Sequence, residues 1–261
     1  MAVRGLDLFQ ERFADFQDAY ILIGGAACEL WFAEQSLEFR LTKDLDIVLI
    51  LDRLTSEFVD RFWRFIDDGQ YQIKRRNDDG PPVLYRFEKS ANEKFPMKVE
   101  LFCRTGDEFA VPPGQHIVPL RMEDAQSLSA ILLDEHYYRF LLRHCHISRG
   151  IHAADGIALI PLKARAWLDL TDRKARGTSV PDREIKKHRN DVFRLAVTLP
   201  GDPGEELPEQ LSTDLAAFLA QFPDGHAEWA DILKAIRPTI GPTIQPATLI
   251  EAIRTYYRLP S

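Results

Sequence analysis

The sequence of 261 residues is poor in cysteine and contains no long hydrophobic run. Its three cysteines are far apart and form no CxxC pair, which argues against a disulfide framework and favours a reducing compartment. The longest aliphatic stretch, IVLIL after Asp46, is far shorter than the roughly 20 apolar residues of a membrane-spanning helix. The first residues, MAVRGLDLFQERFADF, mix both charge signs and lack the apolar segment of a signal peptide. We therefore expect a soluble, cytoplasmic protein without a membrane partner.

An excess of positive charge is also missing. The formal net charge is −7 and the isoelectric point lies near 5.6, so the chain has no overall basic field that would attract nucleic acid. A local basic face stays compatible with this composition. Hydrophobic residues make up 45% and charged residues 28% of the chain, a balance typical of a globular protein with an apolar core. The length suits one large domain or two modest ones.

The front part of the chain, residues 1–157, is predicted to be an α/β domain. Helical spacing of phenylalanine and leucine predicts helices, whereas short aliphatic or alternating runs bounded by turn residues predict strands. We expect helices over 5–18, 26–35 and 56–68, and strands over 20–23, 45–51, 71–76, 82–89 and 97–104. Further β-like pieces are HIVPL (116–120), LSAILLD (128–134) and YYRFLLRHCHI (137–147).

The pattern changes near residues 155–160, and residues 158–261 are predicted to form a helical domain. IALIP reads as a last strand-like piece, after which a helix begins with Leu162 and stops at Gly177. Proline followed by acidic residues, PDRE, is typical of a helix start. The expected helices cover 162–177, 181–199, 208–222, 227–236 and 247–257.

Two aspartates mark the start of the predicted strand 45–51. Side chains at i and i+2 of a strand point to one face, so Asp44 and Asp46 project together. Two adjacent carboxylates resist joint ionisation unless a cation lies between them. Hard divalent ions prefer such oxygen ligands, and Mg²⁺ usually shares them with substrate phosphates. A DxD pair by itself is weak evidence, because most such pairs lie at solvated strand starts.

Two further features strengthen the metal interpretation. Gly24 and Gly25 end one strand and open a helix, where free backbone N–H groups can meet a phosphate, although the same pair also fits a plain tight turn. Glu100 lies in MKVELFCR on the same strand face as Lys98. Should this strand neighbour the one that begins at Asp44, the three acids would converge on one or two Mg²⁺ ions. A solvent-facing glutamate is the alternative.

These residues together resemble a known group of enzymes. A double glycine, a helix, RxTxDxD on a strand and an acid on a later strand are similar to the DNA polymerase β-like nucleotidyltransferase superfamily. The likeness is strongest to the branch with the AbiEii-type toxins of type IV toxin–antitoxin systems, and it covers residues 20 to about 195. It implies an α/β (α+β) nucleotidyltransferase fold with a mixed β-sheet, followed by a C-terminal helical domain. The residues that carry it are Gly24, Gly25, Arg40, Thr42, Asp44 and Asp46.

The resemblance also assigns roles in the predicted site. Asp44, Asp46 and Glu100 would be catalytic and bind Mg²⁺, while the double glycine, Arg40, Thr42 and Lys43 would bind the nucleotide. The helical half would add Lys163, expected in the first turn of its helix, and Asp191 from KKHRND. A surface lysine and an ordinary loop arginine are the alternatives for Lys163 and Arg40. The implied partners are a nucleoside triphosphate, an RNA acceptor and a cognate antitoxin.

The predicted reaction is transfer of a nucleoside monophosphate from the triphosphate to an acceptor hydroxyl or phosphate. Two alternatives stay open, a catalytically silent nucleotide-binding module and an enzyme that modifies a small molecule such as an antibiotic. The basic run RKARG…DREIKKHR is either a solvated helix face or a contact to RNA. His144 and His146 would share one strand face without a further metal ligand, so a zinc site is not expected.

Overall fold

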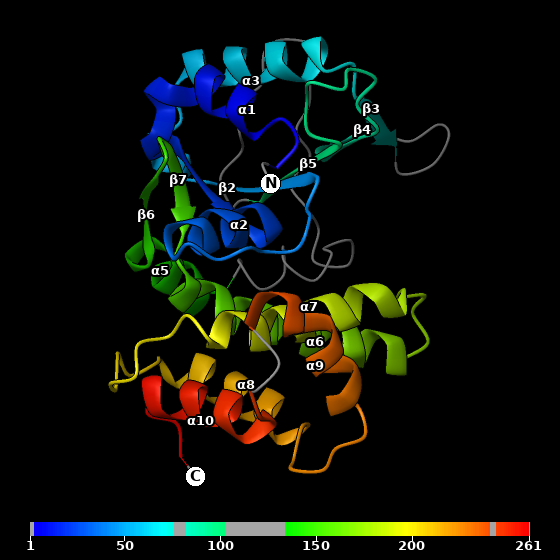
Figure 1. Cartoon of the computed structure of the whole chain (residues 1–261). Helices are drawn as coiled ribbons and strands as arrows, with labels where there is room; N and C mark the ends of the chain where they lie inside the picture. Colours follow the sequence, from blue (N-terminus) through cyan, green and yellow to red (C-terminus); the bar gives the residue numbers. More distant parts are fainter. Residues whose placement is uncertain (1–2, 76–81, 103–133, 241–243, 261) are drawn as a thin grey trace. The chain divides into compact units, whose positions relative to one another are not determined.

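A computed structural model describes residues 3–75, 82–102, 134–240 and 244–260. The chain forms two compact units, drawn in Figure 1. The first consists of Met1–Leu133 with Cys145–Asp155, and the second of Asp134–His144 with Gly156–Ser261. The division after Asp155 lies close to the boundary that the sequence predicts. The sequence did not predict that Asp134–His144 would belong to the helical unit.

A mixed sheet of seven strands forms the centre of the first unit, in the order β3-β4-β5-β2-β1-β7-β6 among the described residues. β2 runs parallel to β5 and β1 parallel to β7, and the other neighbours are antiparallel. The mixed sheet confirms the expected α/β class. The strands are β1 (Tyr20–Ile23), β2 (Asp44–Leu49), β3 (Gln72–Arg75), β4 (Pro82–Glu88), β5 (Lys98–Phe102), β6 (Cys145–Ser148) and β7 (Ile151–Ala154).

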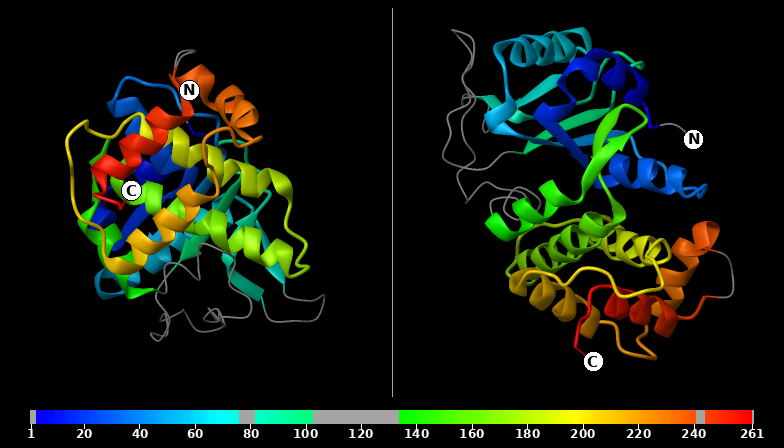
Figure 2. Two further views of the ribbon diagram at one scale, coloured as in Figure 1. Left: turned by 90° about the horizontal axis from the view of Figure 1, so that it is seen from below. Right: turned by 90° about the vertical axis from the view of Figure 1, so that its left-hand side faces the viewer.

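Helices cover both faces of this sheet, as the two views of Figure 2 show. α1 (Leu6–Phe13) and α3 (Ser56–Asp68) pack together through aromatic rings, with Phe13 5.5 Å from Phe65 between ring centroids. α2 (Gly24–Glu34) lies against β1 and β2 on the opposite face. Two short 3₁₀ turns, η1 (Ala14–Ala19) and η2 (Leu51–Arg53), connect these elements.

The predicted helix 56–68 is confirmed as α3 with the same bounds. Its phenylalanines repeat every three to four residues and are buried, so one face of the helix packs on the sheet. Thr55 caps the helix, because its hydroxyl accepts the backbone N–H of Phe58 at 3.2 Å. Gly69 follows the last turn. The helical spacing in the sequence and the buried face of α3 therefore agree.

The second unit is helical, as expected. Aromatic side chains fill its core, with the ring of Phe193 4.8 Å from that of Trp229 and 5.5 Å from that of Phe218 between centroids. None of the helices in the described ranges is both long and apolar enough to span a membrane. The helices are α5 (Glu135–Arg143), α6 (Gly156–Ala175), α7 (Asp182–Ala196), α8 (Glu209–Ala220), α9 (Trp229–Ile240) and α10 (Pro246–Tyr256).

The expected β-like piece 137–147 is wrong over most of its length. Residues up to Arg143 belong to helix α5, and only the end of the piece forms β6. Asp134 caps the helix by accepting the backbone N–H groups of His136 and Tyr137. Tyr137 is buried, and its hydroxyl donates to Asp214 of α8 at 2.9 Å, which ties α5 to the helical unit. The pieces 116–120 and 128–133 lie outside the described residues.

The expected strand-like IALIP is also wrong, because α6 begins at Gly156 and runs through Pro161. Proline has no N–H, so the carbonyl of Ile157 loses its helical donor four residues later. The hydroxyl of Tyr257 donates to this carbonyl at 2.8 Å. A buried side chain from the end of the chain therefore replaces the missing backbone donor, and the helix continues past the proline.

This replacement predicts a coupling between two substitutions. Tyr257→Phe leaves the Ile157 carbonyl without its hydroxyl donor, and we expect it to lower the free energy of unfolding by about 1–2 kcal/mol. In a Pro161→Ala background the backbone N–H is restored, so the same substitution should cost clearly less. Urea unfolding of the four proteins of this double-mutant cycle measures the difference. Equal costs in both backgrounds would contradict the explanation.

Candidate functional site

The double glycine begins helix α2, and an aspartate from the next strand lies against it. Gly24 has φ +70°, a conformation that favours glycine. A Cβ atom at Gly24 would lie only 1.9 Å from Oδ2 of Asp46. Ile23, at the N-cap, provides no side-chain hydrogen bond to the first turn. The Asp46 carboxylate therefore closely approaches the positive end of helix α2, whose N-cap residue forms no side-chain hydrogen bond.

The second glycine is close to the other polar residues of the motif. A Cβ atom at Gly25 would lie 2.7 Å from the Thr42 hydroxyl and 3.6 Å from Nη2 of Arg40. The Arg40 guanidinium stacks over Phe39 at 5.1 Å from the ring centroid. Lys43 is exposed, and its backbone carbonyl accepts the N–H of Met97. Arg40, Thr42 and Asp46 are thus brought to the start of α2 although many residues separate them from it in sequence.

The strand that carries Glu100 does neighbour the strand that begins at Asp44. β2 and β5 are parallel, and their register places Asp46 beside Glu100 and Asp44 beside Lys98. Residues paired in this way point to the same face of the sheet. The three acids therefore share one face, while Leu45 on the opposite face is fully buried.

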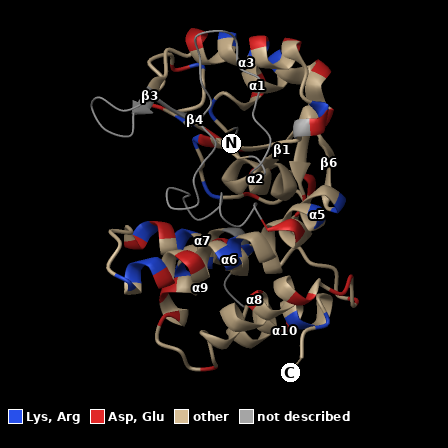
Figure 3. Ribbon diagram, turned by 180° about the vertical axis from the view of Figure 1, so that it is seen from behind, with Lys and Arg blue, Asp and Glu red and all other residues tan. Residues whose placement is uncertain are grey.

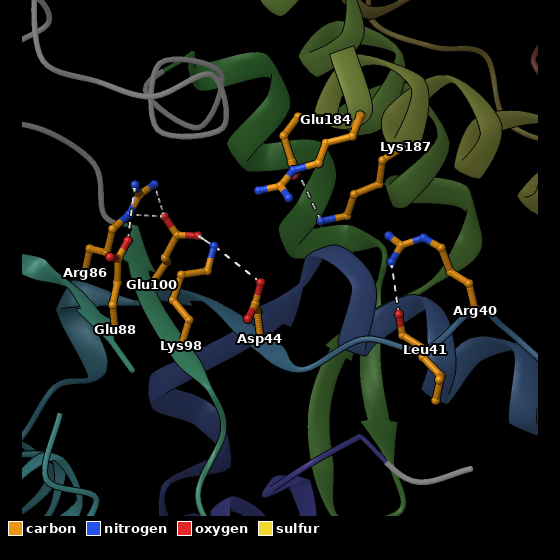
Figure 4. Close-up of polar contacts among 10 residues, drawn as sticks. Arg40, Leu41, Asp44, Arg86, Glu88, Lys98, Glu100, Glu184 and Lys187 are labelled. Atoms are coloured by element: carbon orange, nitrogen blue, oxygen red, sulfur yellow. Dashed lines mark hydrogen bonds and ion pairs between the residues drawn. The ribbon is translucent and has the colours of Figure 1, made fainter. Parts of the chain in front are cut away.

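Two cations lie among these acids, as Figure 4 shows. Nε of Arg86 on β4 donates to Oε1 of Glu100 at 2.7 Å, and its Nη2 bonds to the same oxygen. The Lys98 ammonium bonds to Oε2 of Glu100 and lies 3.4 Å from Oδ2 of Asp44. Both oxygens of Glu100 are thus in contact with positive charge. The ion pairs form one chain from Arg86 through Glu100 and Lys98 to Asp44.

Arg86 is a residue of the site that sequence reasoning missed. The alternation in PVLYRFEK places Arg86 and Glu88 on one strand face. This alternation is the only feature of the sequence that could have indicated a role for Arg86. The antiparallel register of β4 and β5, which pairs Arg86 with Glu100, decides the contact. That register depends on the tertiary pairing of the strands and cannot be read from either strand by itself.

The ion pairs shift the pKa values of their members. Burial raises the pKa of Glu100, but the charges of Lys98 and Arg86 and their hydrogen bonds outweigh burial, so the net shift is downward. Burial lowers the pKa of Lys98, and the carboxylates of Glu100, Asp46 and Asp44 reverse this effect and raise it. Glu100 and Lys98 are therefore both charged at neutral pH.

The site has the donor chemistry that Mg²⁺ requires. Carboxylate oxygens are its preferred protein ligands, and the Asp44 side chain is 28% exposed, which leaves it accessible. Together with Lys98 and Arg86 the three acids carry one net negative charge. Within the described ranges, no group of three or more Asp, Glu, His or Cys side chains is arranged to hold a metal ion. The three acids therefore fit a divalent ion in donor type and net charge, while the Lys98 ammonium lies between Asp44 and Glu100.

Lys163 and Asp191 meet inside the helical unit. The Lys163 ammonium donates to Oδ2 of Asp191 at 3.0 Å, and Arg194 donates to Oδ1 at 2.8 Å. Lys163 is 3% and Asp191 0% exposed. The expectation that Lys163 lies in the first turn of its helix is wrong, because α6 begins seven residues earlier, at Gly156. The buried ions join α6 to α7, and each charge has an opposite partner.

The basic run of the helical unit is interleaved with acids, as the mixed colours along α6 and α7 in Figure 3 show. Each of its exposed cations in the described part lies beside a carboxylate, which cancels much of its field. The run is therefore a charge-balanced helix face. The pairs are Arg173–Asp169, Lys174–Asp182, Arg176–Asp172, Arg183–Glu184, Lys187–Glu184 and Lys186–Asp231.

The histidines near Cys145 are not arranged as the sequence predicted. His144 follows helix α5 and contacts Glu205, so it is not on the strand of His146. Cys145 instead meets His152 on β7, with 3.1 Å between Sγ and Nε2. Burial raises the pKa of Cys145 to about 11, so its thiol is protonated at neutral pH and is a weak nucleophile.

We compared the chain with models of protein families, with curated proteins and with solved structures, and none of these comparisons gave a match.

The contact between Gly24 and Asp46 predicts an unequal cost of two alanine substitutions. Gly24 and Gly225 both have positive φ, +70° and +77°, but a Cβ at Gly225 would meet nothing within 4 Å. Gly225→Ala should lower the free energy of unfolding by about 1 kcal/mol, from backbone strain only. Gly24→Ala should cost at least about 1 kcal/mol more, because its methyl group displaces the Asp46 carboxylate. Urea unfolding measures both, and equal costs would contradict the contact.

The lowered pKa of Glu100 predicts a pH-dependent contribution to stability. Ionised Glu100 stabilises the fold fully above the ordinary glutamate pKa of about 4.3, and this stabilisation is lost as pH falls through the lower folded-state value. Glu100→Gln should therefore be clearly less stable than the wild type at pH 7, with the difference shrinking below about pH 4. Urea unfolding across this range measures it. Exposed Glu93→Gln is the control, and a constant gap for Glu100→Gln would disprove the ion pairing.

Proposed function

We propose that the chain is a Mg²⁺-dependent nucleotidyltransferase, which transfers a nucleoside monophosphate from a nucleoside triphosphate to an acceptor hydroxyl or phosphate. One observation carries the proposal. Asp46 lies against Gly24 at the start of helix α2 and is paired in register with Glu100 on β5. An acid suited to bind a metal ion and a helix end suited to bind phosphate are thereby next to each other, which supports a phosphoryl-transfer chemistry.

Each residue of the site has a role in this proposal. Asp44 and Asp46 hold the metal ion, and Glu100 is the third carboxylate of the set. The backbone N–H groups at Gly24 and Gly25 bind phosphate oxygens, because the start of a helix carries partial positive charge. The residues beside Gly25, Arg40 and Thr42, and the exposed Lys43 add a cation, a hydroxyl donor and a second cation for the triphosphate.

The chemistry separates into what a bound ion supplies and what the protein does. When bound, Mg²⁺ neutralises charge on the phosphates and favours the departure of pyrophosphate. Arg40 stabilises the negative charge that grows on the phosphate oxygens. One of the site carboxylates accepts the proton of the attacking hydroxyl. Positioning and charge neutralisation supply most of the rate acceleration in reactions of this kind.

The proposal also extends to the acceptor of the nucleotide and to a protein partner. The resemblance to AbiEii-type toxins extends it to an RNA acceptor and to a cognate antitoxin, with Lys163 and Asp191 as further catalytic residues. The charge-balanced run on α6 and α7 does not support RNA binding on that face. Incubation with labelled triphosphates and either total RNA or small-molecule acceptors separates the two classes. Label that stays out of RNA would refute the toxin-like acceptor.

The proposal predicts that Asp46→Asn loses Mg²⁺-dependent triphosphate binding and most of the transfer activity. Removing one charge from the metal site should abolish Mg²⁺-dependent binding of the triphosphate and lower the rate of transfer by about 100-fold or more. Isothermal calorimetry with each triphosphate, with and without Mg²⁺, measures the binding. Labelled-nucleotide transfer measures the rate.

The matched control is Asp52→Asn, which makes the same chemical change at an exposed position after β2. It should leave both binding and transfer unchanged. Triphosphate binding that needs no Mg²⁺ and survives in Asp46→Asn would refute the enzymatic proposal and indicate a nucleotide sensor.

A further inference from the structure

Lys98 occupies a bridging position in the acid cluster. Its ammonium bonds to Oε2 of Glu100 and lies 3.4 Å from Oδ2 of Asp44. The carboxylate of Asp46 also acts on its charge. These are the three carboxylates that would hold a divalent ion in the proposed function. The lysine therefore already contacts oxygens of Asp44 and Glu100 that a metal ion would need.

The two cations of the cluster differ in how firmly they are placed. Arg86 holds Oε1 of Glu100 through Nε and Nη2 of its planar group and also lies 3.7 Å from Glu88. A guanidinium bound in this way has a fixed orientation. Lys98 is a point charge at the end of a flexible stem, its side chain is 26% exposed, and its contact with Asp44 is the longer one. Lys98 is thus the cation that can leave Asp44 while Arg86 stays on Glu100.

We propose that Lys98 is the resident counter-cation of the acid cluster, and that a divalent ion must displace it from Asp44 in order to bind. Lys98 would then set the affinity of the site. While no metal is bound, it removes the repulsion between Asp44 and Glu100, which would otherwise destabilise the paired strands β2 and β5. Once its contact with Asp44 is broken, its charge opposes metal binding. This inference rests on the proposed function.

The sign of the effect distinguishes this role from a purely structural one. A lysine that only supports the fold, or that holds the acids in place for the metal, would weaken metal binding when it is removed. A counter-cation has the opposite effect, because its removal leaves three carboxylates with one cation fewer. Lys98→Met should therefore bind divalent ions at least about tenfold more tightly than the wild type.

The test is a titration of the full chain with Mn²⁺, without nucleotide, in which electron paramagnetic resonance reports free Mn²⁺. Calorimetry with Mg²⁺ repeats the measurement. Lys98→Arg keeps the positive charge and should stay within about threefold of the wild type. Lys94→Met removes an exposed lysine from the loop before β5 and controls for overall charge; it should also stay within about threefold. Lys98→Gln gives a second neutral variant, judged by the same criterion, in case Lys98→Met does not fold.

The outcomes separate this inference from the proposed function. Unchanged or weaker metal binding in the neutral Lys98 variants overturns the counter-cation role. So does a gain in Lys98→Arg as large as that in Lys98→Met, because charge would then not be the cause. If the wild type still binds Mg²⁺ through Asp46 in either case, the proposed function stands. Absence of divalent-ion binding in the wild type and in Lys98→Met, with and without a triphosphate, overturns both.

Discussion

The parallel pairing of β2 with β5 is the constraint on which the site depends. It places Glu100 beside Asp46 and Lys98 beside Asp44, and a slip of one residue would turn either set to the opposite face. That opposite face is apolar and packs against the aromatic side chains of α1 and α3. Burial of residues such as Leu45 and Val99 on this face therefore fixes the register of the two strands. The hydrophobic core thus determines which charged side chains meet on the other side of the sheet.

Charge balance follows from this arrangement. Three carboxylates on one face would repel each other, and Lys98 on β5 and Arg86 on the neighbouring strand β4 offset most of that repulsion. The remaining negative charge and the nearby start of α2 make the place suitable for a metal-bound triphosphate. In the proposed function, stability without a ligand and affinity for a divalent ion therefore oppose each other at Lys98.

In the helical unit, buried polar groups form hydrogen bonds with residues from distant parts of the sequence. Tyr257 supplies the donor that Pro161 removes from the backbone, and Asp191 pairs with Lys163 and Arg194 in the buried space between helices. The contacts of Tyr257 and Lys163 join residues far apart in the sequence, whereas Arg194 lies three residues after Asp191 on the same helix. Buried polar groups must find such partners, because leaving one unpaired costs about 1–3 kcal/mol.

The sequence by itself determined the features that depend on short-range periodicity. These are helix α3, the shared face of Asp44 and Asp46, and the change from mixed to helical structure after residue 155. Tertiary structure decided the rest. Arg86 reached Glu100 through strand pairing, and α6 continued through Pro161 because of Tyr257. The segment Asp134–His144 joined the helical unit through contacts such as that of Tyr137 with Asp214. The physical reason is that alternation and helical spacing act over a few residues, whereas charges and missing donors are satisfied by whichever groups the packed core brings near them.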